Sequence, residues 1–184
     1  GMGQGQPFAR GFGLVLLASL LYSLGFQGPG AALPLFGRSL GATDAEIGLL
    51  TGLFALMALL GRPFVSLLLD RGHKRAVLVA GTLIFVVSAL GYAAATAVLP
   101  LLGLRLLNGA GHAAGQTASQ ALATDNAPPA RRGEALALQA LMLTLALAFS
   151  PVLGVAIAQA AGFPALFLLA AACSALSALV ATRI

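Results

Sequence analysis

Charged residues are scarce in this chain of 184 residues, and their scarcity excludes a water-soluble domain. Asp, Glu, Lys and Arg together make up 8% of the sequence, whereas soluble domains carry about 25%. Hydrophobic residues account for 59%, and the mean hydropathy is +0.98. A chain of this length cannot hide so much apolar surface from water in one core, so lipid must surround it.

Acidic residues are the rarest charged group, and none lies inside a long apolar stretch. The five are Asp44, Glu46, Asp70, Asp125 and Glu134, all at the ends of such stretches. No carboxylate within the membrane is therefore available to carry a proton. Arg62 and Arg105 lie inside apolar stretches and stay charged. His112 is the one side chain there that ordinarily titrates near neutral pH.

The sequence also lacks the motifs of several other protein classes. A single cysteine, Cys173, excludes a disulfide framework or a cysteine-based metal site within one chain. There is no Walker loop for ATP-driven pumping, and no G-x-S-x-G-like segment accompanies His112 as an intramembrane protease would need. The net charge of +5 comes from cations at the ends of apolar stretches, so a nucleic-acid partner is not expected. We expect neither an enzyme nor a bound cofactor or metal.

What the sequence does contain is six apolar stretches, each long enough to cross a bilayer as a helix. The predicted helices cover about residues 12–40, 44–69, 75–96, 100–124, 132–160 and 163–182. Thr43-Asp44-Ala45-Glu46 is a capping box that opens the second helix, and Pro164 suits the first turn of the sixth. Gly28-Pro29-Gly30 and Pro34 should bend the first helix.

The chain is therefore predicted to be an all-α integral membrane protein with one six-helix domain over residues 12–184. Residues 1–11 are expected to be a tag remnant, at Gly1 and Met2, followed by a cytoplasmic lead-in. A cleaved signal peptide is the poorer interpretation, because five more apolar stretches follow the first.

The cations predict the orientation of these helices. Seven of them fall on one side of the predicted bundle: Arg10, Arg71, Lys74, Arg75, Arg131, Arg132 and Arg183. Arg38 alone falls on the other side. The positive-inside rule assigns the seven to the cytoplasm. Both termini should therefore be cytoplasmic, in a multi-pass protein of the inner membrane.

A weak internal repeat relates the two halves of the chain. Glu46 precedes Pro63 by 17 residues, and Glu134 precedes Pro151 by the same 17, an offset of 88 positions that also relates the starts of corresponding helices. Two tandem units of three spans must be inserted with opposite topology, and inverted repeats of this kind are typical of secondary transporters. Evenly spaced helices would also give a constant offset, so this alternative stays open.

The segment from Arg62 to Arg75 reads RPFVSLLLDRGHKR and lies at the end of the second helix and in the following loop. It resembles the G-x-x-x-D-R-x-G-R-R signature of the major facilitator superfamily. The charged positions are occupied by Asp70, Arg71, Lys74 and Arg75. Ser66 replaces the first glycine, and the second glycine is shifted to Gly72.

The resemblance implies that this charged cluster pairs with the acidic residue closing the fourth helix, Asp125, and forms a gate on the cytoplasmic side. Asp70 is predicted to need a cationic partner, because the carbonyl end of a helix already presents negative charge. Arg71, Lys74 and Arg75 are nearby candidates. The alternative is a loop of basic residues that only sets the membrane topology.

The fourth helix carries RLLNGAGHAAG from Arg105 to Gly115, which is similar to the superfamily's R-x-x-Q-G-x-G pattern with Asn108 at the Gln position. Arg105, Asn108 and His112 share a helix face, and a guanidinium within a membrane should face a cavity or a partner. His112 is either a hydrogen-bonded packing residue or a proton carrier. Gly111 and Gly115 form a surface that another helix backbone can approach closely.

The fifth helix contains Ser150-Pro151-Val152-Leu153-Gly154 after Ala146, and it resembles the G-x-x-x-G-P-x-x-G segment of the superfamily's exporters. Ser150, Pro151 and Gly154 would permit a bend and a close helix contact. The connector at 123–135 resembles that of the drug- and sugar-efflux branch. Efflux is therefore the favoured direction.

Taken together, the resemblance implies the N-terminal half of a secondary transporter working by alternating access. Arg105, Asn108, His112 and Gln139 are expected to face its substrate cavity. The expected partners are the lipid bilayer, a small-molecule solute and a second six-helix half. That half is either another copy in a homodimer or a C-terminal half missing from this chain. The alternative is an isolated half, a structural domain without transport activity.

Overall fold

A computed structural model of the chain describes residues 5–184, with side chains from residue 10 onward. In this part the chain forms α1 (Gly5–Ser39), α2 (Asp44–Asp70), α3 (Lys74–Ala94), α4 (Val98–Asp125), the 3-10 turn η1 (Pro129–Arg131), α5 (Arg132–Ala161) and α6 (Phe163–Ala181). The predicted all-α class is confirmed. Helix ends lie within about two residues of the predicted ones, except that α1 begins at Gly5. The predicted tag remnant at Gly1 and Met2 lies outside the described residues.

Residues next to the two ends of α2 explain where this helix begins and ends. The Thr43 hydroxyl accepts a hydrogen bond from the Glu46 backbone N–H at 3.2 Å, so the N-cap bond of the predicted capping box is formed. At the other end of α2, Gly72 has a φ of +85°. A residue with a Cβ avoids this left-handed conformation, so glycine allows the tight turn into α3.

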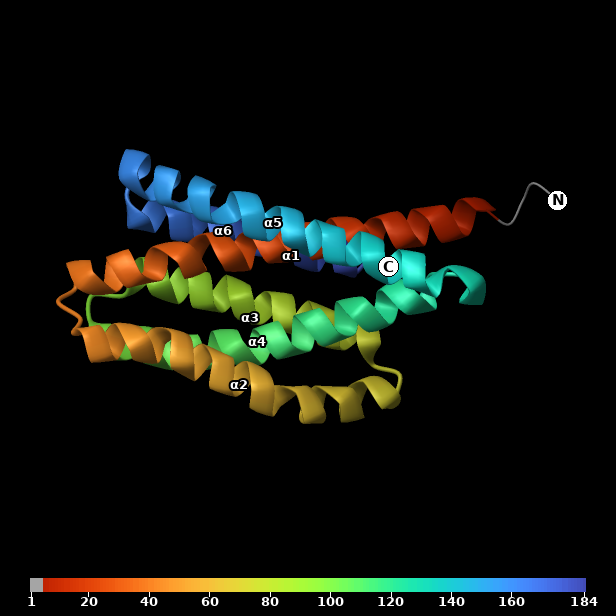
Figure 1. The fold of residues 1–184 in the computed structure, drawn as a ribbon, viewed down its shortest axis with the longest axis horizontal. Coiled ribbons are helices and arrows are strands. Elements are labelled where there is room, and N and C mark those ends of the chain that lie inside the picture. Colours follow the sequence, from red (N-terminus) through yellow and green to blue (C-terminus); the bar gives the residue numbers. More distant parts are fainter. Residues whose placement is uncertain (1–4) are drawn as a thin grey trace.

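The helices run lengthwise and antiparallel, which sorts the connections to two ends of the bundle (Figure 1). The start of α1, the α2–α3 loop, the α4–α5 connection and the C-terminus lie at one end. The other three loops lie at the opposite end. Arg71, Lys74, Arg131 and Arg183 therefore share one end of the molecule, and Arg38 belongs to the other.

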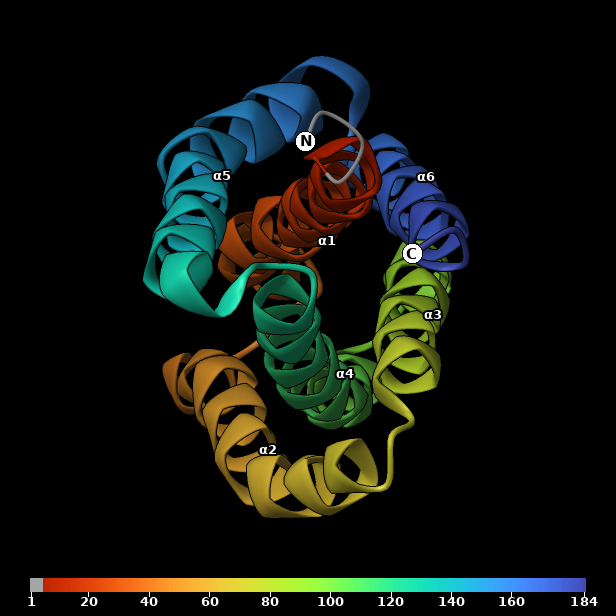
Figure 2. The same ribbon diagram turned by 90° about the vertical axis from the view of Figure 1, so that its right-hand side faces the viewer.

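Two central helices organise the packing. In the end view of Figure 2, α1 and α4 lie in the middle with the other four helices around them. α4 packs most extensively against α2 and α3, α1 packs against α5 and α6, and α3 and α6 join the two groups. One buried apolar cluster, around Leu78 and Leu122, lies towards the cation-rich end, and a second, around Leu101 and Phe167, lies towards the other.

Five of the described helices are long and apolar enough to cross a membrane: α1, α2, α3, α5 with η1, and α6. Their outer faces carry apolar side chains such as Leu59, Phe64 and Val152, which are 66%, 71% and 70% exposed. α4 is not among the five, because it carries buried polar residues such as Arg105 and Asn108. Neighbouring helices enclose α4, so its side chains need not suit lipid.

Candidate functional site

The glycines predicted on the fourth helix lie at its contacts with α1 and α3. A Cβ added to Gly111 would lie 2.7 Å from Ile84 Cγ2, and one added to Gly81 would lie 2.8 Å from the Gly115 nitrogen. A Cβ at Gly115 would collide with the ring of Tyr22. These distances are too short for any side chain, so the helices approach this closely only because glycine occupies these positions.

The small residues predicted on the fifth helix lie at its contact with α1. A Cβ at Gly154 would lie 2.6 Å from the Gly28 carbonyl oxygen, which fixes a backbone-to-backbone contact. Pro151 lies within α5, which continues on both sides of it. Ser150 is buried, and its hydroxyl has no hydrogen-bond partner among the described residues.

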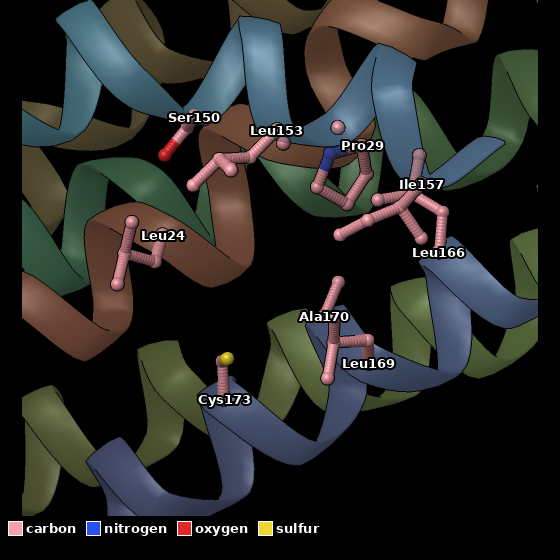
Figure 3. Close-up of a pocket in the computed structure, with 11 residues that line it drawn as sticks. Leu24, Pro29, Ser150, Leu153, Ile157, Leu166, Leu169, Ala170 and Cys173 are labelled. Carbon is pink, nitrogen blue, oxygen red and sulfur yellow. The ribbon is translucent and has the colours of Figure 1, made fainter. Parts of the chain in front are cut away.

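Ser150 and Gly154 also border a cavity of about 130 Å³ between α1, α5 and α6 (Figure 3). Leucine, isoleucine, proline and alanine side chains make most of its wall, and Cys173 lies on the α6 side. No charged side chain borders this cavity. Its walls suit an apolar molecule and cannot compensate the lost hydration of a charged solute.

A second cavity, of about 150 Å³, lies between α1, α4 and α5 and is lined by several polar side chains. The polar members are Tyr22, Ser23, Gln27, His112, Gln116 and Thr144. Phe26, Leu143 and Leu147 complete its wall. Polar groups that converge in an otherwise apolar membrane protein mark a path or a binding site. We therefore take this polar cavity as the candidate solute site.

Tyr22 holds His112 in place at the wall of the polar cavity. Its hydroxyl lies 3.0 Å from both Nδ1 and the carbonyl oxygen of His112. Tyrosine has a single O–H, so both contacts form together when the hydroxyl donates to the carbonyl and Nδ1–H donates to the hydroxyl oxygen. In that tautomer Nε2 is an acceptor. His112 thus combines the two expected roles of a hydrogen-bonded packing residue and a cavity residue.

Aromatic rings from two other helices pack against His112, and a third helix contributes a ring to the same cluster. Its ring centroid lies 4.7 Å from that of Phe26 on α1 and 5.3 Å from that of Phe54 on α2. Phe26 and Phe54 are stacked at 5.0 Å, and Phe85 of α3 lies 5.4 Å from Phe26. Of these rings, Phe26 lines the polar cavity, and Phe54 and Phe85 support it from behind.

Arg62 connects α2 to this cavity. Its Nη2 donates to Oε1 of Gln116, one of the cavity residues, at 3.2 Å, and Arg62 is otherwise exposed. The guanidinium is also close enough to interact electrostatically with His112 and Tyr22. A permanent positive charge therefore lies at the edge of the polar cavity.

Arg105 and Asn108 do not line the polar cavity, in contrast to the prediction. Arg105 is 7% exposed, its Nε donates to the Leu50 carbonyl at 2.7 Å, and its guanidinium lies 4.4 Å from the Phe54 ring centroid. Asn108 is also buried, and its Oδ1 has no hydrogen-bond partner among the described residues. Through these contacts Arg105 joins α4 to α2.

Gln139 is also displaced from its predicted place in the cavity. It is 1% exposed, and its Nε2 donates to the Ser119 hydroxyl at 2.8 Å and approaches the Ser19 hydroxyl at 3.5 Å. A buried amide needs partners, and these come from α4 and α1. Gln139 therefore ties α5 to the two central helices. Of the four predicted cavity residues, His112 is the one that lines the polar cavity.

The charged residues predicted for a gate lie at the cation-rich end. Lys74 Nζ lies 2.6 Å from Asp125 Oδ2, which joins the start of α3 to the end of α4. Arg75 Nη2 donates to the carbonyl of Thr182, just after α6. Arg71 follows α2 and is exposed. Asp70 is exposed and makes no ion pair with any described side chain.

Five polar residues that line the cavity were missing from the sequence-based prediction: Tyr22, Ser23, Gln27, Gln116 and Thr144. Arg62, at its edge, was not predicted to belong to it either. Ser23 and Gln27 are four residues apart on α1, and Gln116 continues the spacing from His112 on α4. Polar residues repeated at this spacing inside apolar helices were a detectable signal.

The comparisons with known proteins agree on one family. Residues 15–184 match the family described as Major Facilitator Superfamily. A protein of Methanocaldococcus jannaschii named as an uncharacterized MFS-type transporter is 31% identical over 134 residues. That match covers 73% of this chain and 34% of the relative. The chain thus spans about a third of the length of the curated relative it matches.

Proposed function

The chain belongs to the major facilitator superfamily, and on that premise we propose that it is the N-terminal six-helix half of a secondary active transporter. It moves a small solute across the membrane by alternating access. The observation that carries the proposal is the polar cavity between α1, α4 and α5. Polar side chains such as His112, Gln116 and Thr144 are costly within apolar helices, and binding a solute would account for their gathering at one cavity.

The packing of the helices supports two inverted three-helix repeats. α1 packs against α5 and α6, and α4 packs against α2 and α3. If α1, α2 and α3 correspond to α4, α5 and α6, each first helix packs against the second and third helices of the other repeat. In this arrangement α4 is the sixth span, shielded from lipid by its neighbours. The concentration of cations at one end supports cytoplasmic termini and an inner-membrane location.

The Lys74–Asp125 ion pair supports a gate at the cytoplasmic end. Arg71 and Arg75 extend the positive surface around it, and Asp70 remains available for a partner in another state of the transporter. Contacts that form in one state and break in the other make such an element bistable. In the alternating-access cycle the cluster would close the cytoplasmic side.

The second half of the transport unit would pack beside the polar cavity. α2 and α5 border this side and expose the large side chains of Leu56, Leu60, Leu141 and Leu145. A second copy of the chain or a C-terminal half of a twelve-helix protein would fit this surface. Export is the favoured direction, because the segment around Pro151 resembles that of the family's exporters.

Flux through liposomes containing the purified chain tests the proposal. We expect uptake or efflux of at least one of a panel of labelled organic acids, sugars and amines, and loss of that flux without loss of expression in Asp70→Asn. Absence of flux for the whole panel, with a monomer in detergent, would contradict transport by this chain. It would favour the alternative of a structural half.

A further inference from the structure

The fixed charge that this chain contributes to the membrane interior is entirely positive. In the described helices the acidic residues lie at helix ends: Asp44 and Glu46 begin α2, Asp70 ends it, Asp125 ends α4 and Glu134 begins α5. Arg10 lies in the second turn of α1, and deeper in the described helices the charged side chains are Arg62 and Arg105. A cation in this environment needs an acceptor or a counterion.

The two arginines differ in whether that need is met. Arg105 is buried, donates to the Leu50 carbonyl and lies over the Phe54 ring. Arg62 is exposed and makes one hydrogen bond to a described residue, to Gln116. A guanidinium has five N–H donors, and none of the ion pairs among the described side chains includes Arg62. Its remaining donors are free to bind an anion.

Arg62 lies inside α2 and not at its end. It precedes the end of the helix, Asp70, by eight residues, which corresponds to about 12 Å along the axis. Arg62 donates to Gln116, which lines the polar cavity, so its guanidinium lies at the edge of that cavity. An anion bound in the cavity can therefore reach it.

The cavity wall beside Arg62 combines a polar side with an apolar side. Gln116 and His112 present polar atoms next to the guanidinium, and Phe26, Leu143 and Leu147 form an apolar surface. Deepening the function proposed above, and resting on it, we infer that the solute is an organic anion with a small apolar body. Arg62 binds its carboxylate or phosphate in this geometry, and the body packs against Phe26.

Equilibrium dialysis with three labelled probes of one shape tests this inference: benzoate, benzyl alcohol and benzylamine. The protein is the full chain in phosphatidylcholine nanodiscs. Benzoate should bind best, and Arg62→Gln should weaken its binding by roughly tenfold or more, because a charge-assisted hydrogen bond is lost. Arg62→Lys should retain part of the affinity. Binding of benzyl alcohol should change little.

Arg38→Gln is the matched control, since Arg38 is an exposed arginine at the opposite end of the bundle. It should leave benzoate binding unchanged. Circular dichroism and gel filtration of Arg62→Gln check that the variant is folded. Absence of benzoate binding, or equal binding by folded Arg62→Gln, would overturn the inference.

Two further measurements identify the source of the anion and distinguish failure of the anion inference from failure of the transport proposal. If phosphatidylglycerol in the nanodiscs displaces benzoate, the anion at Arg62 is a lipid headgroup and the solute assignment is wrong. If liposome flux of a neutral or cationic solute persists in Arg62→Gln, transport stands and the anion inference fails. Benzoate binding that depends on Arg62, without any flux, would leave the anion site standing and remove transport.

Discussion

Polar residues within the helices divide into those that are buried in contacts between helices and those that lie at the polar cavity. Arg105 and Arg62 are both arginines within membrane helices, but Arg105 is enclosed between α4 and α2 whereas Arg62 lies at the polar cavity. Gln139 and Gln116 divide in the same way. Polar chemistry alone does not indicate which role such a residue has.

Arg105→Lys should destabilise the protein by about 2 kcal/mol or more, because lysine cannot reproduce both a guanidinium hydrogen bond and stacking on an aromatic ring. The affected contacts are those with Leu50 and Phe54. Unfolding by denaturant in detergent, followed by circular dichroism, measures the change. Arg38→Lys is the control and should have little effect. If Arg105→Lys is as stable as the parent but loses solute binding, Arg105 acts in the cavity instead.

Gly154→Ala should lower the free energy of unfolding by about 1–3 kcal/mol, since an added methyl in a well-packed contact forces backbone shifts. The new Cβ would lie 2.6 Å from the Gly28 carbonyl oxygen. Gly52→Ala on α2 is the control: a Cβ there meets nothing within 4 Å, and alanine is the better helix former. Equal unfolding midpoints for the two variants would argue against a close α1–α5 contact.

Among the helices, α4 makes the most varied contacts. It packs against α2 and α3, contributes His112 and Gln116 to the polar cavity, and ends at Asp125 in an ion pair with α3. Burial by neighbours explains why α4 can carry more polar residues than a lipid-facing helix. α4 therefore links the polar cavity, along its middle, to the charged cluster at its C-terminal end.

Neutralising Lys74 or Asp125 should reduce solute flux severalfold while changing stability by about 1 kcal/mol or less, because partly exposed ion pairs contribute little to folding. The exchange Lys74→Asp with Asp125→Lys should recover part of the flux. Liposome flux and detergent unfolding measure the two effects separately. The Arg38–Asp44 pair is the matched control at the opposite end. Equal loss of flux on breaking that pair would contradict a specific role for Lys74–Asp125.

At the scale of the whole molecule, the bundle has a cation-rich end and an end with few charges, and its outer helices are apolar. This asymmetry determines the expected insertion in the membrane. It follows from the antiparallel course of the helices, which brings every second connection to the same end.

Cysteine labelling tests the insertion directly, because Cys173 is the single cysteine of the sequence. In a Cys173→Ser background, cysteines introduced at His73 and Arg131 should react with an impermeant maleimide from the same side. A cysteine at Gly41 should react from the opposite side. Labelling of the first two positions from opposite sides would contradict the topology and the transporter proposal built on it.

The sequence alone determined the helices, since apolar length, the Thr43–Glu46 capping box and the flanking cations act locally or through lipid. It also indicated the glycine contacts of α4 and α5, because small residues at helical spacing have few other uses in a membrane. Only the tertiary structure decided which polar residues face the cavity. Arg105, Asn108 and Gln139 are turned into contacts with neighbouring helices, and Tyr22, Arg62 and Gln116 converge on His112. Helical periodicity gives the face on which a side chain lies, but the packing of the helices determines whether that face meets a neighbour or a cavity.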